Sequence, residues 1–212
     1  MKLYTRVVLI LLFGALASCA TTGGDIGGLF PSPKFLKGII KGDIYTTNDG
    51  SLSVAVPHKE GSYEYTYMQV KEQYSPLGDY ISFGPAALDK SIYRVETGKR
   101  VSPNSAVTGI EEIASKIVEG YKTQLTQSYG TTPEQLSSSV ETINGRRAYY
   151  WHFSQTVPPG KYISNSNATF SHHVYVLDME QGPAIAWVQL PPERVTRPAL
   201  AHRAFAQSIA RR

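Results

Sequence analysis

The sequence predicts an α+β domain in which an antiparallel sheet packs against a long central helix and a C-terminal helix. Three observations lead to this class. Runs of alternating apolar and polar residues are separated by Asp-Gly and Asn-Gly pairs, which is typical of β-hairpins. One stretch in the middle of the chain has apolar residues at spacings of three and four, which is typical of an amphipathic helix. A shorter stretch with the same spacing lies near the C-terminus.

The first predicted hairpin joins residues 44–47 to residues 52–56. Asp49-Gly50 lies between the two runs, and glycine adopts the positive φ that a tight turn requires. Further strands are predicted over residues 80–83 and 92–97, where β-prone side chains are bounded by turn-forming residues.

A second strand signal follows the hairpin and contains a row of tyrosines. Tyr63, Tyr65 and Tyr67 alternate with polar or flexible residues and therefore share one face of a strand. Tyrosine combines apolar area with a polar tip and is enriched at interfaces. The three residues are a candidate interaction surface, and the ordinary alternative is a half-buried strand face.

The central helix is the most clearly patterned element. Thr108 and Glu111 form a T-x-x-E capping box at its start, and Gly130 is placed to end it. Its apolar stripe consists of Ile110, Ile113, Ala114, Ile117, Val118, Tyr121 and Leu125.

Four more strands follow in two hairpins. Residues 136–143 and 147–157 are joined at Asn144-Gly145, and residues 169–177 and 184–190 at Gln181-Gly182. A terminal helix is then predicted after Pro198. Its apolar face consists of Ala201, Ala204, Phe205 and Ile209.

The N-terminus has the layout of a secretory signal. Lys2 and Arg6 precede an uncharged apolar run over residues 7–17, which is too short to span a bilayer as a helix. We expect residues 1–18 to be removed, residues 19–42 to form a tether, and residues 43–212 to form one globular domain. Residues 35–40 are partly apolar, and their packing onto the domain remains an open alternative.

The sequence Leu16-Ala17-Ser18-Cys19 resembles the lipobox of bacterial lipoproteins. That resemblance implies cleavage before Cys19, the single cysteine of the chain, and acylation of its thiol and new amino group. An exported chain with one cysteine cannot form an internal disulfide, so acylation accounts for the thiol. Two or three acyl chains give lasting attachment to a membrane. Because Ala20 stands where lipoproteins of the inner membrane often carry Asp, the expected location is the periplasmic face of the outer membrane.

Charge argues against a nucleic-acid partner. Removal of Lys2 and Arg6 with the signal reduces the 21 Lys and Arg to 19, against 17 Asp and Glu. This balance does not supply the dense basic face on which phosphate binding depends.

Signatures of catalysis are missing from the sequence. It contains no G-x-S-x-G, H-E-x-x-H, P-loop or G-x-G-x-x-G pattern, so we expect no enzyme, no metal and no cofactor. His152 with His172 or His173 is a weaker candidate for metal or hydrolytic chemistry, although adjacent residues of a strand point to opposite faces. The ordinary alternative is that these histidines are structural.

Aromatic side chains on the predicted strands are candidates for a ligand pocket. Trp151, His152 and Trp187 are the residues that we place in it, for a lipid or glycan held between sheet and helix. The alternative is that Tyr149, Trp151 and Phe153 form the inner face of the sheet in an ordinary core.

The order of the elements resembles that of PsbP-like domains. The segments DGSLSVAVP (residues 49–57) and VETINGRRAYYWHF (residues 140–153), and a last strand leading into an Ala/Phe helix, are similar to those of the group. The resemblance implies an α/β/α sandwich. Members include an extrinsic subunit of photosystem II and envelope lipoproteins of the DcrB type, which implies a binding or assembly module rather than an enzyme.

The leading functional hypothesis is therefore a lipid-anchored envelope protein that binds another envelope protein in assembly or maintenance. A periplasmic carrier of a small lipid or glycan is the second hypothesis. A histidine-based hydrolase or metal enzyme is the third.

Overall fold

The computed structural model describes residues 38–57, 69–75, 78–84, 92–98, 110–160, 166–190 and 201–211. Cys19 and the three tyrosines of the predicted interaction surface, Tyr63, Tyr65 and Tyr67, lie outside these ranges, as do residues 1–18. Within the described ranges, no helix combines the length and the apolar composition needed to cross a bilayer.

Eleven strands and two helices make up the described part of the chain. In chain order they are β1 (Ile39–Lys41), β2 (Ile44–Thr46), β3 (Leu52–Ala55), β4 (Gln69–Ser75), β5 (Gly78–Gly84), β6 (Ile92–Thr97), α2 (Ile110–Tyr129), β7 (Glu134–Ile143), β8 (Arg146–Val157), β9 (Ala168–Leu177), β10 (Ala184–Leu190), α3 (His202–Gln207) and β11 (Ala210–Arg211).

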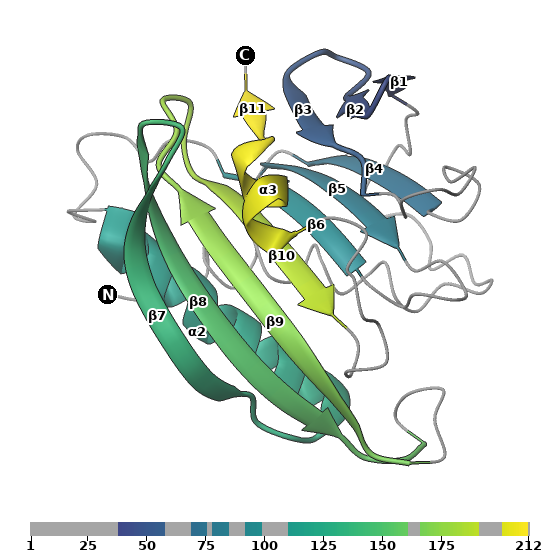
Figure 1. Ribbon diagram of the computed structural model, residues 1–212, viewed down its shortest axis with the longest axis vertical. Helices are drawn as coiled ribbons and strands as arrows, with labels where there is room; N and C mark the ends of the chain where they lie inside the picture. Colours follow the sequence, from purple (N-terminus) through teal and green to yellow (C-terminus); the bar gives the residue numbers. More distant parts are fainter. Residues whose placement is uncertain are drawn as a thin grey trace, which may run out of the picture.

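A seven-stranded antiparallel sheet is the centre of the fold, with the order β4-β5-β6-β10-β9-β8-β7 (Figure 1). The hairpin between β7 and β8 turns at Asn144-Gly145, as predicted, and both residues have positive φ, 51° and 74°. These angles match the tight turn that an Asn-Gly pair favours between antiparallel strands. The predicted strand β6, residues 92–97, is also confirmed.

A second, four-stranded sheet has the order β1-β2-β3-β11. The sequence predicts a single sheet, and this part of the prediction is wrong. The last strand, β11, returns from the C-terminus and pairs with β3, so that Ala210 lies opposite Ser53. Strands of two or three residues are too short to show the alternation by which strands are recognised in a sequence.

The folded part of the chain also begins earlier than the predicted boundary at residue 43. Strand β1 pairs with β2 inside the predicted tether, and Ile40 packs against the core. The backbone N–H of Gly38 donates a hydrogen bond to the hydroxyl of Tyr45 at 2.7 Å. The alternative in which residues 35–40 pack onto the domain therefore holds for the described residues 38–40.

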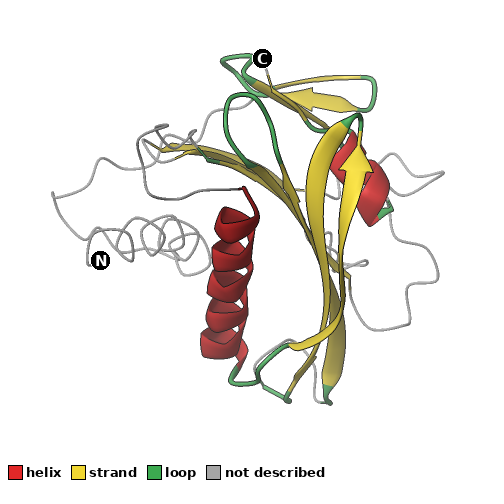
Figure 2. Ribbon diagram, turned by 90° about the vertical axis from the view of Figure 1, so that its left-hand side faces the viewer, coloured by secondary structure: helices red, strands yellow, loops and turns green. Residues whose placement is uncertain are grey.

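Helix α2 covers one face of the large sheet (Figure 2). Its predicted apolar stripe faces the strands, and Ala114, Val118, Tyr121 and Leu125 are buried there. Gly130 ends the helix with φ of 76°, which is the left-handed conformation that glycine adopts readily. The long helix is thus present with the predicted face buried.

Helix α3 and the small sheet lie on the opposite face (Figure 2). Phe205 of α3 is fully buried and makes edge-to-face contacts with Phe83 and Tyr93, at centroid distances of 6.2 and 5.2 Å. The predicted C-terminal helix is therefore present but has only six residues. The large sheet separates two apolar cores, one under α2 and one under α3.

Candidate functional site

Side chains of β8 and β9 alternate between the two faces of the large sheet, and this alternation sorts the candidate residues. His152 lies directly opposite His173, and Trp151 lies opposite Val174. Residues that are paired across an antiparallel ladder share a face. His152 and His173 therefore lie on the face that α3 covers, and Trp151 lies on the face that α2 covers. We call them the α3 face and the α2 face.

Three imidazoles form a stack on the α3 face. The ring centroids of His152 and His173 are 4.4 Å apart, and those of His173 and His202 are 3.9 Å apart. The ring planes are inclined by only 11° and 3°. We call these residues, one each from β8, β9 and α3, the histidine stack.

Tyrosine hydroxyl groups hold two rings of the histidine stack, His173 and His202. The hydroxyl of Tyr150 is hydrogen-bonded to Nδ1 of His173 at 2.8 Å. The hydroxyl of Tyr175 is hydrogen-bonded to Nδ1 of His202 at 2.9 Å. Helix α3 is thereby joined to the sheet through polar contacts as well as through Phe205.

Ser171 joins His152 and His173, the two histidines of the stack that lie in the sheet. Its Oγ lies 2.7 Å from Nε2 of His152 and 3.1 Å from Nε2 of His173. The hydroxyl has one proton, so only one of the two rings can accept it, and the other ring donates to the oxygen.

Burial keeps the stacked rings uncharged at neutral pH. Desolvation, followed by the neighbouring His202, lowers the pKa of His173 from 6.5 to about 3. Desolvation also lowers the pKa of His202 and of His152. Neutral imidazoles stack on one another without the repulsion that two imidazolium ions would have at this separation.

His172 does not belong to the histidine stack, although the sequence offers it as an alternative partner of His152. It lies on the α2 face, where its ring stacks on Trp187 with centroids 5.8 Å apart. Burial lowers its pKa to about 3. The structure therefore brings His152 together with His173 and not with His172.

The described residues include no group of three or more His, Cys, Asp or Glu placed to hold a metal ion. Stacked rings present their faces to one another, whereas a metal binds in the plane of an imidazole at the nitrogen atom. The histidine stack is therefore suited to packing and hydrogen bonding.

The predicted pocket residues Trp151, His152 and Trp187 do not meet. Trp187 is buried on the α2 face beneath Tyr121, with ring centroids 6.2 Å apart. Trp151 is half-buried on the same face, next to Tyr149. The sheet separates both tryptophans from His152, and the strand aromatics pack against α2 as core residues.

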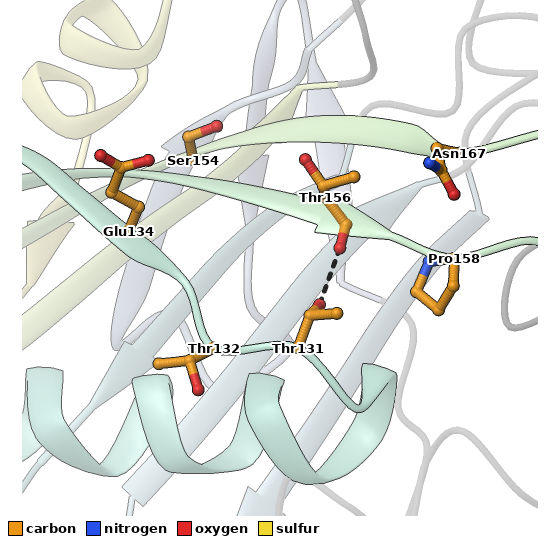
Figure 3. Close-up of a pocket in the computed structure, with 7 residues that line it drawn as sticks. All are labelled: Thr131, Thr132, Glu134, Ser154, Thr156, Pro158 and Asn167. Atoms are coloured by element: carbon orange, nitrogen blue, oxygen red, sulfur yellow. Dashed lines mark hydrogen bonds between the residues drawn. The ribbon is translucent and has the colours of Figure 1, made fainter.

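A shallow hollow of about 350 Å³ opens at the end of β7 and β8 (Figure 3). Among the described residues, hydroxyl, amide and carboxylate groups line it together with the ring of Pro158, and no described basic residue does. The lining residues are Thr131, Thr132, Glu134, Ser154, Thr156, Pro158 and Asn167. Glu134 and Ser154 lie opposite each other in the ladder, so the hollow adjoins the α3 face beside His152.

Among the strands whose burial the structure describes, β7 is the most exposed, and it is an edge of the large sheet in the described part of the chain. All seven residues from 134 to 140 are exposed. Leu136 and Val140 are 52% and 55% exposed, although both are large and apolar. The sequence predicts this strand but does not mark it as a site, because EQLSSSVETI contains no recognised binding motif. The feature of the sequence that could have indicated an exposed strand is its run of three serines between Leu136 and Val140.

Edge strands carry unpaired backbone N–H and C=O groups, and proteins usually protect them with lysine, proline or a bulge. Strand β4, at the other edge, carries Lys71 in its middle. Strand β7 contains neither lysine nor proline, and within the described residues its protection is a bulge between Gln135 and Ser137.

No protein-family model matches the chain, and no curated sequence matches it. Among solved structures, it is similar to the solution structure of cyanobacterial PsbP (CyanoP) from Synechocystis sp. PCC 6803. The TM-score is 0.50 at 10% sequence identity, over 89% of this chain and 98% of that chain. At this identity the likeness shows the fold alone. The chain has a PsbP-like fold, and the resemblance stated from the sequence is confirmed at that level.

Proposed function

We propose that the chain is a lipoprotein of the cell envelope whose domain binds another envelope protein and catalyses no reaction. Cys19, at the end of the Leu-Ala-Ser-Cys segment, is the point of attachment, and the periplasmic face of the outer membrane is the location. The bound protein takes part in assembly or maintenance of the envelope. The lipobox-like segment supports the anchor, and the exposed edge strand supports the binding role.

The observation that carries the binding role is the exposure of β7. An extended segment of a partner can add to such an edge, so that backbone hydrogen bonds give affinity and side chains give specificity. Leu136 and Val140 provide exposed apolar area on the same strand. A long edge without lysine or proline is otherwise a hazard for uncontrolled pairing, and a resident partner removes that hazard.

Photocrosslinking in intact cells tests this proposal. A benzophenone amino acid replaces Val140 on β7 in one strain, and Gln127 on the exposed side of α2 in a control strain. We expect a light-dependent product of defined mass from position 140, its loss when Ser138→Lys is added, and no such product from position 127. The same products from both positions, or a position-140 product that survives Ser138→Lys, would contradict the proposal.

A further inference from the structure

The histidine stack ends abruptly at β7. His173 in β9 and His152 in β8 are cross-strand partners, and their rings are 4.4 Å apart. On the other side of His152, its cross-strand partner is Ser137 of β7, which has no ring. In the described part of the chain, His152 makes no ring contact other than that with His173. One face of its imidazole therefore borders the space above Ser137.

Acceptor groups lie beside this space on the same face, at Glu134 of β7 and at Ser154, two residues after His152 in β8. Glu134 lies opposite Ser154, just as Ser137 lies opposite His152. Glu134 makes no hydrogen bond or ion pair with the described residues, and it lines the hollow together with the hydroxyl of Ser154 and the amide of Asn167 (Figure 3). Among the described residues that line the hollow, Glu134 is the one charged side chain, so the charge complement of this lining is a cation.

We infer that the partner segment at β7 carries an aromatic residue that lies over Ser137 against the free face of His152, and a basic residue two positions further on that enters the Glu134 hollow. This inference rests on the proposed function, because it needs a strand added to β7. Strands in a sheet lie about 4.8 Å apart, which is close to the spacing of the stacked rings. A strand added to β7 can therefore contribute one more ring to the histidine stack. Aromatic residues cover glycines at sheet edges in a comparable way.

Residues two apart in a strand share a face, as His152 and Ser154 do in β8. In a partner that runs antiparallel to β7, the basic residue follows the aromatic one. The fitting segment is therefore aromatic-x-basic in an otherwise extended, β-prone context. Acidic residues at the second position would meet Glu134 with like charge.

Synthetic peptides test the inference on the purified full chain. The probe is the capped peptide Thr-Val-Thr-Trp-Thr-Lys-Thr-Val, and the matched control has the same composition with Trp and Lys exchanged. Further peptides carry Ala for Trp, or Glu for Lys. We expect replacement of Trp by Ala to weaken binding about three- to tenfold, as loss of an aromatic pair does. The exchanged peptide and the Glu peptide should also bind more weakly than the probe.

Nuclear magnetic resonance measures the chemical shifts of the His152 ring protons, which report the aromatic contact itself rather than the affinity of the peptide. The probe should shift the ring protons of His152 upfield, and the Ala peptide should not. Ser137→Phe places a phenyl ring of β7 itself against His152. It should weaken binding of the probe and leave binding of the Ala peptide unchanged. Ser138→Phe, on the other face of the strand, is the control.

The outcomes separate the two proposals. Equal binding of all peptides at β7, with no shift at His152, overturns the inference and leaves β7 as a protein-binding edge. A failure of every peptide to shift any β7 resonance overturns the inference and the proposed docking strand together.

Discussion

The imidazole rings of His173 and His202 lie face to face, with centroids 3.9 Å and planes 3° apart. One ring comes from the middle of the large sheet and the other from the short helix near the C-terminus. This contact, together with buried Phe205, holds α3 on the sheet. Because it depends on uncharged rings, the docking of α3 is linked to pH.

Acid should destabilise the folded chain. The pKa of His173 is lowered to about 3 in the folded state and returns to 6.5 on unfolding, so the unfolded chain binds the proton first. The stability that the neutral ring contributes is fully present above pH 6.5 and is lost as pH falls from 6.5 toward 3. Urea denaturation at a series of pH values measures this loss.

The variant His202→Phe isolates the contribution of the stack. Phenylalanine keeps an aromatic ring against His173 but cannot be protonated. Whatever its stability at pH 7, its free energy of unfolding should fall less steeply between pH 6.5 and pH 4 than that of the original chain. An unchanged slope would show that the docking of α3 does not depend on the charge of this ring.

Truncation of Phe205 should have the largest effect of any single change in α3. The side chain is fully buried against Phe83 and Tyr93. Phe205→Ala should lower the free energy of unfolding by about 3–5 kcal/mol, because it removes apolar contacts and leaves a cavity. Gln207→Ala, at an exposed position of the same helix, should change it by no more than about 0.5 kcal/mol.

The hairpin turn between β7 and β8 offers a test of backbone conformation. Gly145 has φ of 74°, and a Cβ there would meet no atom within 4 Å. Gly145→Ala should therefore cost about 1–2 kcal/mol through the left-handed conformation alone. Gly145→Asn should cost less, since asparagine tolerates this conformation. Equal losses in thermal unfolding would contradict this explanation.

The anchor is tested at Cys19. Cells fed labelled palmitate should transfer label to the original chain and not to Cys19→Ala, which should accumulate as an unprocessed or soluble species. Ser18→Ala, which keeps both the thiol and a small residue before it, should be labelled normally. Normal labelling of Cys19→Ala would contradict acylation at Cys19 and the proposed lipid anchor.

Long periodic elements of this fold could be predicted from the sequence. Helix α2 has its apolar stripe over 20 residues, and its buried face follows from that stripe. Strands β6 to β10 extend over six or more residues and could be predicted as β-prone runs between turns, but β9 and β10 are buried on both faces and β7 is largely exposed, which no alternation in the sequence shows. The short strands β1 and β11 could not be predicted, since two or three residues show no period. Strand β4 was missed because QVKEQYS is largely polar and lacks a run of β-branched residues.

The candidate site was only partly predictable for a related reason. Alternation along β9 places His172 and His173 on opposite faces, as expected, and His152 can be paired with one of them. Which one depends on the register of β8 against β9, which no local pattern fixes. His202 could not be included because its contact with His173 joins residues distant in sequence.

Amide hydrogen exchange tests the central claim most directly. The chain is measured alone and in complex with the protein that crosslinking at position 140 identifies. We predict that the complex slows exchange at those β7 amides that face away from β8, within residues 134–142, and leaves the amides of α2 unchanged. Protection confined to α2 or to the small sheet, with β7 exchanging as fast as before, would contradict the assignment of β7 as the docking strand.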